Sequence, residues 1–355
     1  MIQQMKRFIP ITLLSLSILV QLSGCSISTY PTANISENSS LVHFDINNPP
    51  FDANIEYLLH NGAVDIKSME VLPKIDFGAN TTFSVKYHRS RMFSPPNATI
   101  PLEFSNGLKY AAYLDTGFSE YILLTSDVVL DNKFSILPIT NSLAQGLCHI
   151  PLFKIGPARI KDTAGFYWGQ QLQYRIMNVP VNKYSAIILG LAFIKTFDYV
   201  LFDNVNQEVV FSKEGVFVPD NPDLWQSYPF EIKPDSVPND RIMVQMPIAG
   251  QMFELWFDSC GSMPGLRLSK RAWQVIEPNL NVKRLRKSHI YSYQSGRLQC
   301  QMATVSELSI GAKKINNANV SIYDDSDGLS MFSLGYFQDT AVVLDFVNKL
   351  FWIKK

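Results

Sequence analysis

One pattern of residues occurs twice in this chain. Each copy has two apolar stretches joined by a turn, which predicts a β-hairpin, and each ends in an aspartate. The hairpin runs from Thr99 to Asp115 in the first copy and from Arg241 to Asp258 in the second. A turn glycine lies eight residues before each aspartate. An internal duplication explains the match and predicts two similar lobes.

The match continues downstream of each aspartate. Ala186–Gly190 corresponds to Met331–Gly335, with the glycines 75 and 77 residues after the respective aspartates. A closing pair of strands follows in each copy. The 20 Pro and 18 Gly show no period, and 46% of the residues are hydrophobic, which is typical of a turn-rich protein with a packed core. We therefore predict an all-β fold with short helices and two lobes.

The N-terminal segment predicts the compartment. Lys6 and Arg7 precede an apolar run, Phe8–Val20, that is too short to span a bilayer and is typical of a signal peptide. The run ends in Leu-Ser-Gly-Cys25, which resembles the lipobox of bacterial lipoproteins, with the signal peptide at 1–24. This implies a lipid on Cys25 and a place in the bacterial cell envelope. Ser26 favours the outer membrane, facing the periplasm or the cell surface. An ordinary secretory signal with a chance cysteine is the alternative.

Four regions follow the signal peptide. Residues 25–90 have no partner in the repeat and are predicted to form a tether with accessory strands. Lobe 1 is predicted at 91–218 and lobe 2 at 239–355. Residues 219–238 carry five prolines and are predicted to be a linker, because proline is excluded from central strands and helix interiors. A monomer with two lobes is expected.

The motif after the first hairpin, Leu114-Asp115-Thr116-Gly117, is the main functional signal. With the second copy at Asp258-Ser259, it resembles the aspartic proteases of the retropepsin and pepsin superfamily. The resemblance implies a two-lobed acid-protease fold in which Asp115 and Asp258 meet and activate water against a peptide bond. Two carboxyl groups about 3 Å apart cannot both ionise, so one serves as base and the other as acid; the aspartic-protease pair is the standard example.

The resemblance also assigns supporting residues. The hydroxyls of Thr116 and Ser259 are expected to bond across the two loops, and glycines give the backbone room to approach closely. Glycine-tipped hairpins that close over a peptide or protein substrate are expected between the motifs of each copy; two ordinary surface hairpins are the alternative. The full set comprises Gly117, Gly261, Gly190 and Gly335 beside the aspartates, and Gln145, Gly146, Ser295 and Gly296 in the hairpins.

The second motif departs from the pattern, because it reads Asp258-Ser259-Cys260-Gly261. Either Cys260 replaces the glycine, or it is an insertion and Gly261 takes the role of the glycine. The insertion is preferred, because Gly265–Ser269 then aligns with the apolar strand Tyr121–Thr125. A disturbance beside the carboxylate leaves a second function open, a protease-like scaffold that binds peptide or protein segments without cleaving them.

Composition argues against several other classes. The 31 basic residues equal the 31 acidic residues, so no nucleic-acid partner is expected. The five histidines are dispersed and no CxxC occurs, so neither a metal site nor a cofactor is expected.

Three cysteines remain when Cys25 is set aside: Cys148, Cys260 and Cys300. A disulfide between Cys260 and Cys300 is one possibility, which leaves Cys148 free.

Overall fold

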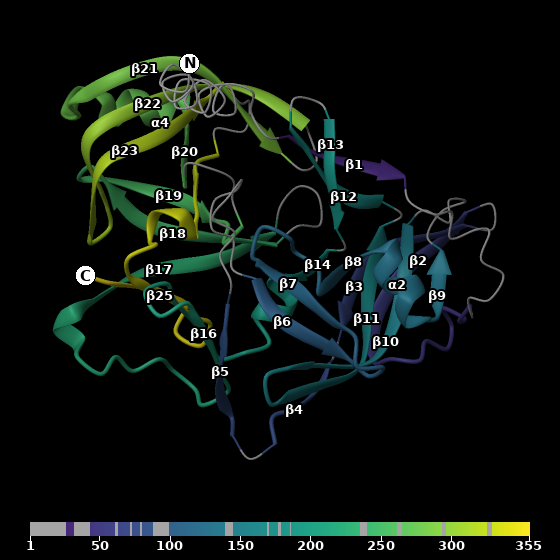
Figure 1. The fold of residues 1–355 in the computed structure, drawn as a ribbon. Helices are drawn as coiled ribbons and strands as arrows, with labels where there is room; N and C mark the ends of the chain where they lie inside the picture. The colour runs from purple at the N-terminus through teal and green to yellow at the C-terminus, as the bar shows by residue number, and fades with distance from the viewer. Residues whose placement is uncertain are drawn as a thin grey trace, which may run out of the picture.

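The chain folds into β-strands with a few short helices in the structure, a computed structural model (Figure 1). The predicted all-β class is confirmed. The structure describes residues 26–31, 43–60, 63–71, 73–78, 80–87, 99–138, 145–168, 170–176, 179–184, 186–234, 240–260, 265–292, 296–324 and 329–355. The predicted signal peptide, Cys25, Gly261 and Ser295 lie outside the described residues. Within the described ranges, no helix is long and apolar enough to cross a membrane.

An eight-stranded sheet in the first half of the chain positions Asp115. At its centre, β14 (Ile187–Gly190) runs parallel to β7 (Lys109–Asp115) and antiparallel to β8 (Ile122–Thr125), and this places Gly190 beside Asp115. Alternate residues of β7, such as Ala112 and Leu114, are buried, as expected for a strand with one face on the core. Across the sheet the strands are β4 (Lys74–Asp76), β11 (Ala158–Trp168), β8 (Ile122–Thr125), β14 (Ile187–Gly190), β7 (Lys109–Asp115), β6 (Thr99–Phe104), β10 (Gln145–Ile155) and β9 (Ile136–Pro138).

The second half of the chain supplies most of a 13-stranded sheet. There β24 runs parallel to β19 and antiparallel to β20, the arrangement that β14 has with β7 and β8. The two halves therefore share the strand order around their aspartates, while the pepsin-like form of the fold remains a prediction. In order, the strands are β21 (Val282–Ser292), β22 (Gly296–Ile310), β23 (Lys313–Tyr323), β20 (Leu266–Ser269), β24 (Met331–Phe332), β19 (Gln251–Phe257), β18 (Asp240–Ile248), β17 (Trp225–Pro234), β26 (Leu350–Lys354), β25 (Ala341–Asp345), β15 (Tyr199–Asp203), β16 (Glu208–Ser212) and β5 (Thr82–Lys86).

The closing strand pairs join the two halves. Strand β15 of the first half pairs antiparallel with β25 of the second, with Val200 opposite Leu344. All five residues of β25 are buried, and one apolar core extends through both halves. The halves are thus held together by backbone hydrogen bonds as well as by packing, which fixes the loops of one half against those of the other.

The turns that close these two strand pairs are built alike. The Asp203 carboxylate accepts hydrogen bonds from the backbone N–H of Val205 at 3.1 Å and of Asn206 at 2.9 Å. In the second turn, the Asp345 carboxylate accepts from the backbone N–H and from the side-chain amide of Asn348, both at 3.0 Å. Aspartate and asparagine stabilise such turns because their short side chains bond the nearby backbone.

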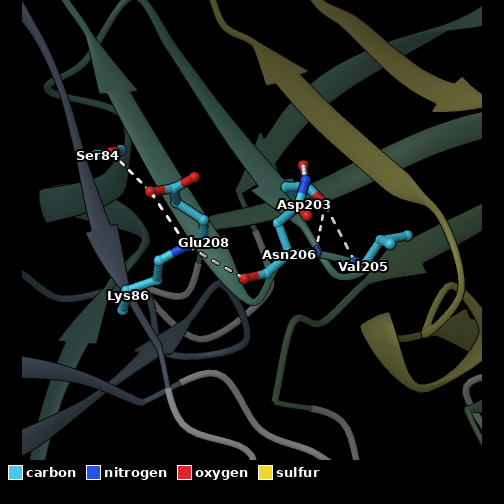
Figure 2. A network of polar contacts seen from close by, with 6 residues as sticks. All are labelled: Ser84, Lys86, Asp203, Val205, Asn206 and Glu208. Carbon is cyan, nitrogen blue, oxygen red and sulfur yellow. Dashed lines mark hydrogen bonds and ion pairs between the residues drawn. The ribbon is translucent and has the colours of Figure 1, made fainter.

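An accessory strand, β5, covers the edge of the 13-stranded sheet. It pairs antiparallel with β16. Figure 2 shows the polar contacts there: Glu208 accepts a hydrogen bond from Ser84 at 2.9 Å and forms an ion pair with Lys86 at 3.6 Å. Lys86 also reaches the backbone oxygen of Asn206 at 3.4 Å. The region before lobe 1 thus contributes strand β5 to this sheet.

The remaining elements are short. Helices α2 and α4 directly follow the equivalent strands β8 and β20, and Ser269 caps α4 by accepting a bond from the N–H of Ala272 at 3.1 Å. Two small sheets contain β1 (Ser26–Pro31), β12 (Gln170–Ile176) and β13 (Val179–Tyr184), and β2 (Ala53–His60) and β3 (Ala63–Val71). The helices are α2 (Ser126–Asn132), α3 (Leu191–Ile194) and α4 (Lys270–Ile276), with 3-10 turns η3 (Pro222–Leu224), η4 (Glu277–Asn279) and η5 (Leu334–Tyr336).

The predicted linker at 219–238 needs correction, because β17 lies within it and is an interior strand of the 13-stranded sheet. Residues 225–229 pair with β26, and residues 230–234 pair with β18. Pro229 lies where the strand changes partners and Pro234 at its end. Proline lacks only the N–H donor, so at these two positions the ladder tolerates it.

Candidate active site

Two loops bring the predicted aspartates together. Asp115 is the last residue of β7, and Asp258 directly follows β19. The backbone N–H of Asp258 is bonded to the carbonyl of Phe332 in β24 at 3.0 Å. Both aspartate side chains are only partly buried. Each carboxyl group is thus fixed by the central strands of its own half and remains within reach of water.

The two loops are joined by reciprocal hydrogen bonds. The N–H of Thr116 donates to the Ser259 hydroxyl, and the N–H of Ser259 donates to the Thr116 hydroxyl, both at 2.9 Å. Each hydroxyl then donates across to the opposite strand: Thr116 to the carbonyl of Phe257 at 3.0 Å, and Ser259 to that of Leu114 at 2.6 Å. Thr116 and Ser259 are 0% and 2% exposed. This buried network holds the loops in one relative position.

The carboxyl groups of Asp115 and Asp258 lie close together beside Gly117, where an added Cβ would be 2.7 Å from the Asp258 carboxyl carbon. Two carboxylates this close repel each other, which favours one proton on the pair. Burial raises the pKa of both carboxyls, and the negative charge of Asp115 raises the pKa of Asp258 further. The backbone N–H of Gly117 donates to Asp115 at 2.8 Å and favours its ionised form. One acid and one base therefore sit side by side.

The structure decides between the two alignments of the second motif. The N–H of Cys260 donates to the Asp258 carboxylate at 2.9 Å, as the N–H of Gly117 does to Asp115. The backbone of Cys260 thus occupies the position of the first-loop glycine, while Gly261, for which that role was preferred, lies outside the described residues. The alignment of the strand at Gly265 with the strand at Tyr121 was right. The carbonyl of Gly265 accepts a backbone hydrogen bond from Ser333, as the carbonyl of Tyr121 accepts one from Gly190. The extra residue therefore falls between Cys260 and Gly265.

Cys260 places a thiol beside the pair. Its sulfur donates to the carbonyl of Leu114 at 3.2 Å. Burial raises the pKa of this thiol well above its usual range, and the charges of Asp115 and Asp258 act in the same direction. The thiol therefore stays protonated and does not act as a nucleophile.

Gly190 and Gly335 are not equivalent, contrary to the repeat as read from the sequence. The N–H of Gly190 bonds to the carbonyl of Tyr121 at 3.0 Å, and in the second half Ser333 makes the corresponding bond to Gly265 at 2.8 Å. Ser333 and Gly190 each cap a short helix and each lie 75 residues after the aspartate. The equal spacing of 75 residues from the aspartate could have identified Ser333 as the counterpart of Gly190. The alignment of the two copies instead followed the Leu-Gly pair, which in the second copy ends two residues later, at Gly335.

The hairpin residues differ in their surroundings. Gly146 is buried between β9 and β11, and a Cβ there would lie 2.4 Å from the carbonyl of Leu137. It is part of the packed sheet and not the tip of a lid; Gln145 begins the same strand. Gly296 pairs with Ser292 at the end of the hairpin β21–β22. That second hairpin stays a candidate lid.

The predicted disulfide does not form. Cys148, Cys260 and Cys300 are all free thiols, so the proposed pairing of Cys260 with Cys300 was wrong. Cys260 instead bonds a carbonyl at the junction of the halves, and Cys300 packs with Tyr323 in the second half. Across the ranges that the structure describes, no three His, Cys, Asp or Glu side chains are grouped so as to hold a metal ion.

The reciprocal network makes Thr116→Val a test of loop fixation. Valine keeps the shape but leaves the N–H of Ser259 and the carbonyl of Phe257 without these partners, which should lower the free energy of unfolding by on the order of 2 kcal/mol. Denaturant melts measure the loss. Thr163→Val is the matched control, because the buried Thr163 hydroxyl makes no hydrogen bond within the described residues. Equal stabilities for the two variants would show that the network does not hold the loops.

The raised pKa of Glu120, next to the first loop, predicts a pH dependence of stability. Burial raises its pKa from 4.5 to about 7; the negative charge of Asp240 adds to this, and Lys195 opposes it. The folded protein then holds a proton that the unfolded chain releases, so stability should fall as the pH rises from about 4.5 to about 7. Glu120→Gln should remove that part of the fall, measured by melts at pH 4 and 8. The same change at exposed Glu231 is the control; parallel pH curves for the wild type and Glu120→Gln would refute the prediction.

The comparisons with known proteins do not show a family for this chain. No family model matches it, and no curated protein matches it. Two similar solved structures are edgp, at 9% identity and TM-score 0.42, and conglutin gamma, a basic 7S globulin from lupine seeds, at 10% identity and TM-score 0.43. The alignments cover 77% and 78% of this chain, and 94% and 95% of those proteins. The expected membership of the aspartic protease superfamily was therefore wrong: no family model supports it, and neither of these two structures is named as a protease.

Proposed function

We propose that this protein hydrolyses peptide bonds with a water molecule activated between Asp115 and Asp258. The observation that carries the proposal is the close approach of the two carboxyls, whose pKa values are raised by burial and, for Asp258, by the charge of Asp115, so that a shared proton is favoured. The ionised carboxyl takes a proton from the water molecule while the water oxygen attacks the peptide carbonyl carbon. The protonated carboxyl hydrogen-bonds the carbonyl oxygen as negative charge develops on it, and a proton finally passes to the leaving amine. The C–N bond breaks, and one water is consumed.

The closeness of the carboxyls favours acyl chemistry over the other main reaction of carboxyl pairs. Glycoside hydrolysis requires its two carboxyls to be separated by about 5 Å or more, so that a sugar ring or a water fits between them. Two carboxyls as close as Asp115 and Asp258 leave no such space. The reciprocal network of Thr116 and Ser259 supports the proposal further, because it fixes the pair in place before substrate binds.

Cys260 supports a second candidate, binding without cleavage. Its side chain lies at the position that is glycine in the first loop, beside both carboxyls. If it holds the pair away from a productive geometry, the protein binds extended peptides but does not cut them. Cys260→Gly separates the two functions: it should create activity in a binding protein, whereas an active hydrolase is already active with Cys260 in place.

The place of action is also a proposal. We propose a lipid on Cys25 that holds the protein in the bacterial cell envelope, with peptides or proteins of that compartment as substrates. In that case Cys25→Ala should move the protein from the membrane fraction to the soluble fraction. An unchanged distribution would contradict the anchor.

Hydrolysis is tested with the purified mature chain and a mixed peptide library in water enriched in ¹⁸O. Mass spectrometry should find one ¹⁸O in each new carboxyl terminus, with cleavage greatest in acid and falling as the shared proton is lost. A library that remains intact between about pH 3 and 8, with the protein folded, would reject hydrolysis and favour the binding function.

A further inference from the structure

A row of side chains extends across the second-half sheet from the position beside Asp258. Trp256 lies two residues before Asp258, and side chains two apart in a strand share a face. Opposite Trp256 in β24 is Met331, opposite Met331 in β20 is Arg267, and opposite Arg267 in β23 is Ser321. In Figure 1, β19, β20 and β23 lie together in the green and yellow half of the molecule. The row thus leads from the carboxyl pair onto one sheet face.

The row carries hydrogen-bond donors. The Arg267 side chain is half-buried, and its guanidinium lies over the ring of Tyr323, 3.6 Å from the centroid. The hydroxyl of Ser321, which is 1% exposed, and the indole N–H of Trp256 are both buried and have no hydrogen-bond partner within the described residues. Guanidinium and indole N–H groups only donate, and a hydroxyl can donate, so together they suit a ligand that only accepts.

The first half offers a matched comparison. The same positions in its sheet are Tyr113, Ile188, Leu123 and Phe166, which form the corresponding row through β7, β14, β8 and β11. Leu123 corresponds to Arg267, so only the second row contains a charge. The Arg267 charge also acts at the site, since it lowers the pKa of Asp258 against the larger effects of burial and of Asp115. The two sides of the carboxyl pair therefore present different chemistry to a substrate.

We infer that Arg267, with Trp256 and Ser321, selects peptides that carry an acidic side chain close to the bond that is cleaved. This inference rests on the proposed hydrolysis and adds its substrate class. A carboxylate is an acceptor-only group, and arginine binds it with two parallel charge-assisted bonds. The inference depends on where the guanidinium lies and on its charge.

The test compares two peptides that differ only by Glu or Gln at one position near the cleaved bond, at a pH where glutamate is ionised. The wild type should cleave the Glu peptide with a kcat/KM on the order of 10-fold to 100-fold higher. Arg267→Leu, which installs the first-half residue, should abolish this preference, and Arg267→Lys should retain part of it. Arg284→Leu, at an exposed position of β21, should keep it. A circular dichroism melt shows whether each variant is folded.

Binding separates a failure of the inference from a failure of hydrolysis. Fluorescence anisotropy with labelled Glu and Gln peptides, on the Asp115→Asn protein with and without Arg267→Leu, reports selection without any cleavage. Tighter binding of the Glu peptide that disappears with Arg267→Leu supports the inference even if no peptide is cut, in which case hydrolysis alone fails. Cleavage of both peptides at equal kcat/KM, or a Glu preference that survives in Arg267→Leu, overturns the inference and leaves hydrolysis standing.

Discussion

Asp258→Asn should lower peptide hydrolysis by about 10²–10⁴-fold, and Asp115→Asn should do the same. Asparagine has nearly the shape of aspartate but can neither take a proton from water nor hold the proton that the two carboxyls share. The measurement is kcat/KM on one peptide that the wild type cleaves. Asp339→Asn, at an exposed ion pair with Lys313, is the matched control and should remain active.

The same variants should fold at least as well as the wild type at neutral pH. Burial and mutual repulsion raise the pKa values of the carboxyls, so the pair destabilises the folded state as the pH rises above the ordinary range for aspartate. A neutral amide removes that effect, and the melting temperature at pH 7 should be equal or higher. Variants that keep activity within about tenfold of the wild type would remove both aspartates from the mechanism.

Gly117→Ala should lower activity by about 10²-fold while costing only about 1–3 kcal/mol of stability. A Cβ at this position would lie 2.7 Å from the Asp258 carboxyl carbon and 2.8 Å from each of its oxygens. The Asp258 carboxyl is the group that can move, so the new methyl group of the alanine displaces it from Asp115. Steady-state kinetics and denaturant melts of one preparation separate the loss of activity from the loss of stability.

Gly335→Ala is the matched control for this glycine. Its Cβ would lie 3.3 Å from the Ser333 hydroxyl and farther from everything else, so both activity and stability should change little. If the two alanine variants lose activity equally, the close approach of Gly117 to Asp258 has no part in catalysis. If both keep full activity, the carboxyl pair tolerates displacement and the proposed geometry is wrong.

The sequence predicted the elements whose signal is local. Alternating apolar residues ending in Asp115 and Asp258 indicated two strands, and both aspartates do lie at strand ends. The hydroxyls of Thr116 and Ser259 were expected to bond across the loops, and the structure contains those bonds. These features follow from patterns of a few residues, which a duplicated chain shows twice.

Other features depend on contacts that no short pattern encodes. The backbone N–H of Cys260 bonds Asp258 as Gly117 bonds Asp115, because a main-chain donor does not depend on the side chain. Its side chain is accommodated where the first loop has none, and only the fold reveals this. Strand β17 was missed because its prolines suggested a linker, although they lie where the strand changes partners and where it ends.

The proton shared by Asp115 and Asp258 can be measured without knowing the substrate. Carbon-13 NMR of aspartate carboxyls, compared between the wild type and Asp115→Asn, identifies the resonance of Asp258 and follows it with pH. We predict that Asp258 titrates well above the ordinary range in the wild type and at a lower pH in Asp115→Asn, because the neighbouring charge is gone. An Asp258 titration that is unchanged by the loss of Asp115 would contradict this prediction.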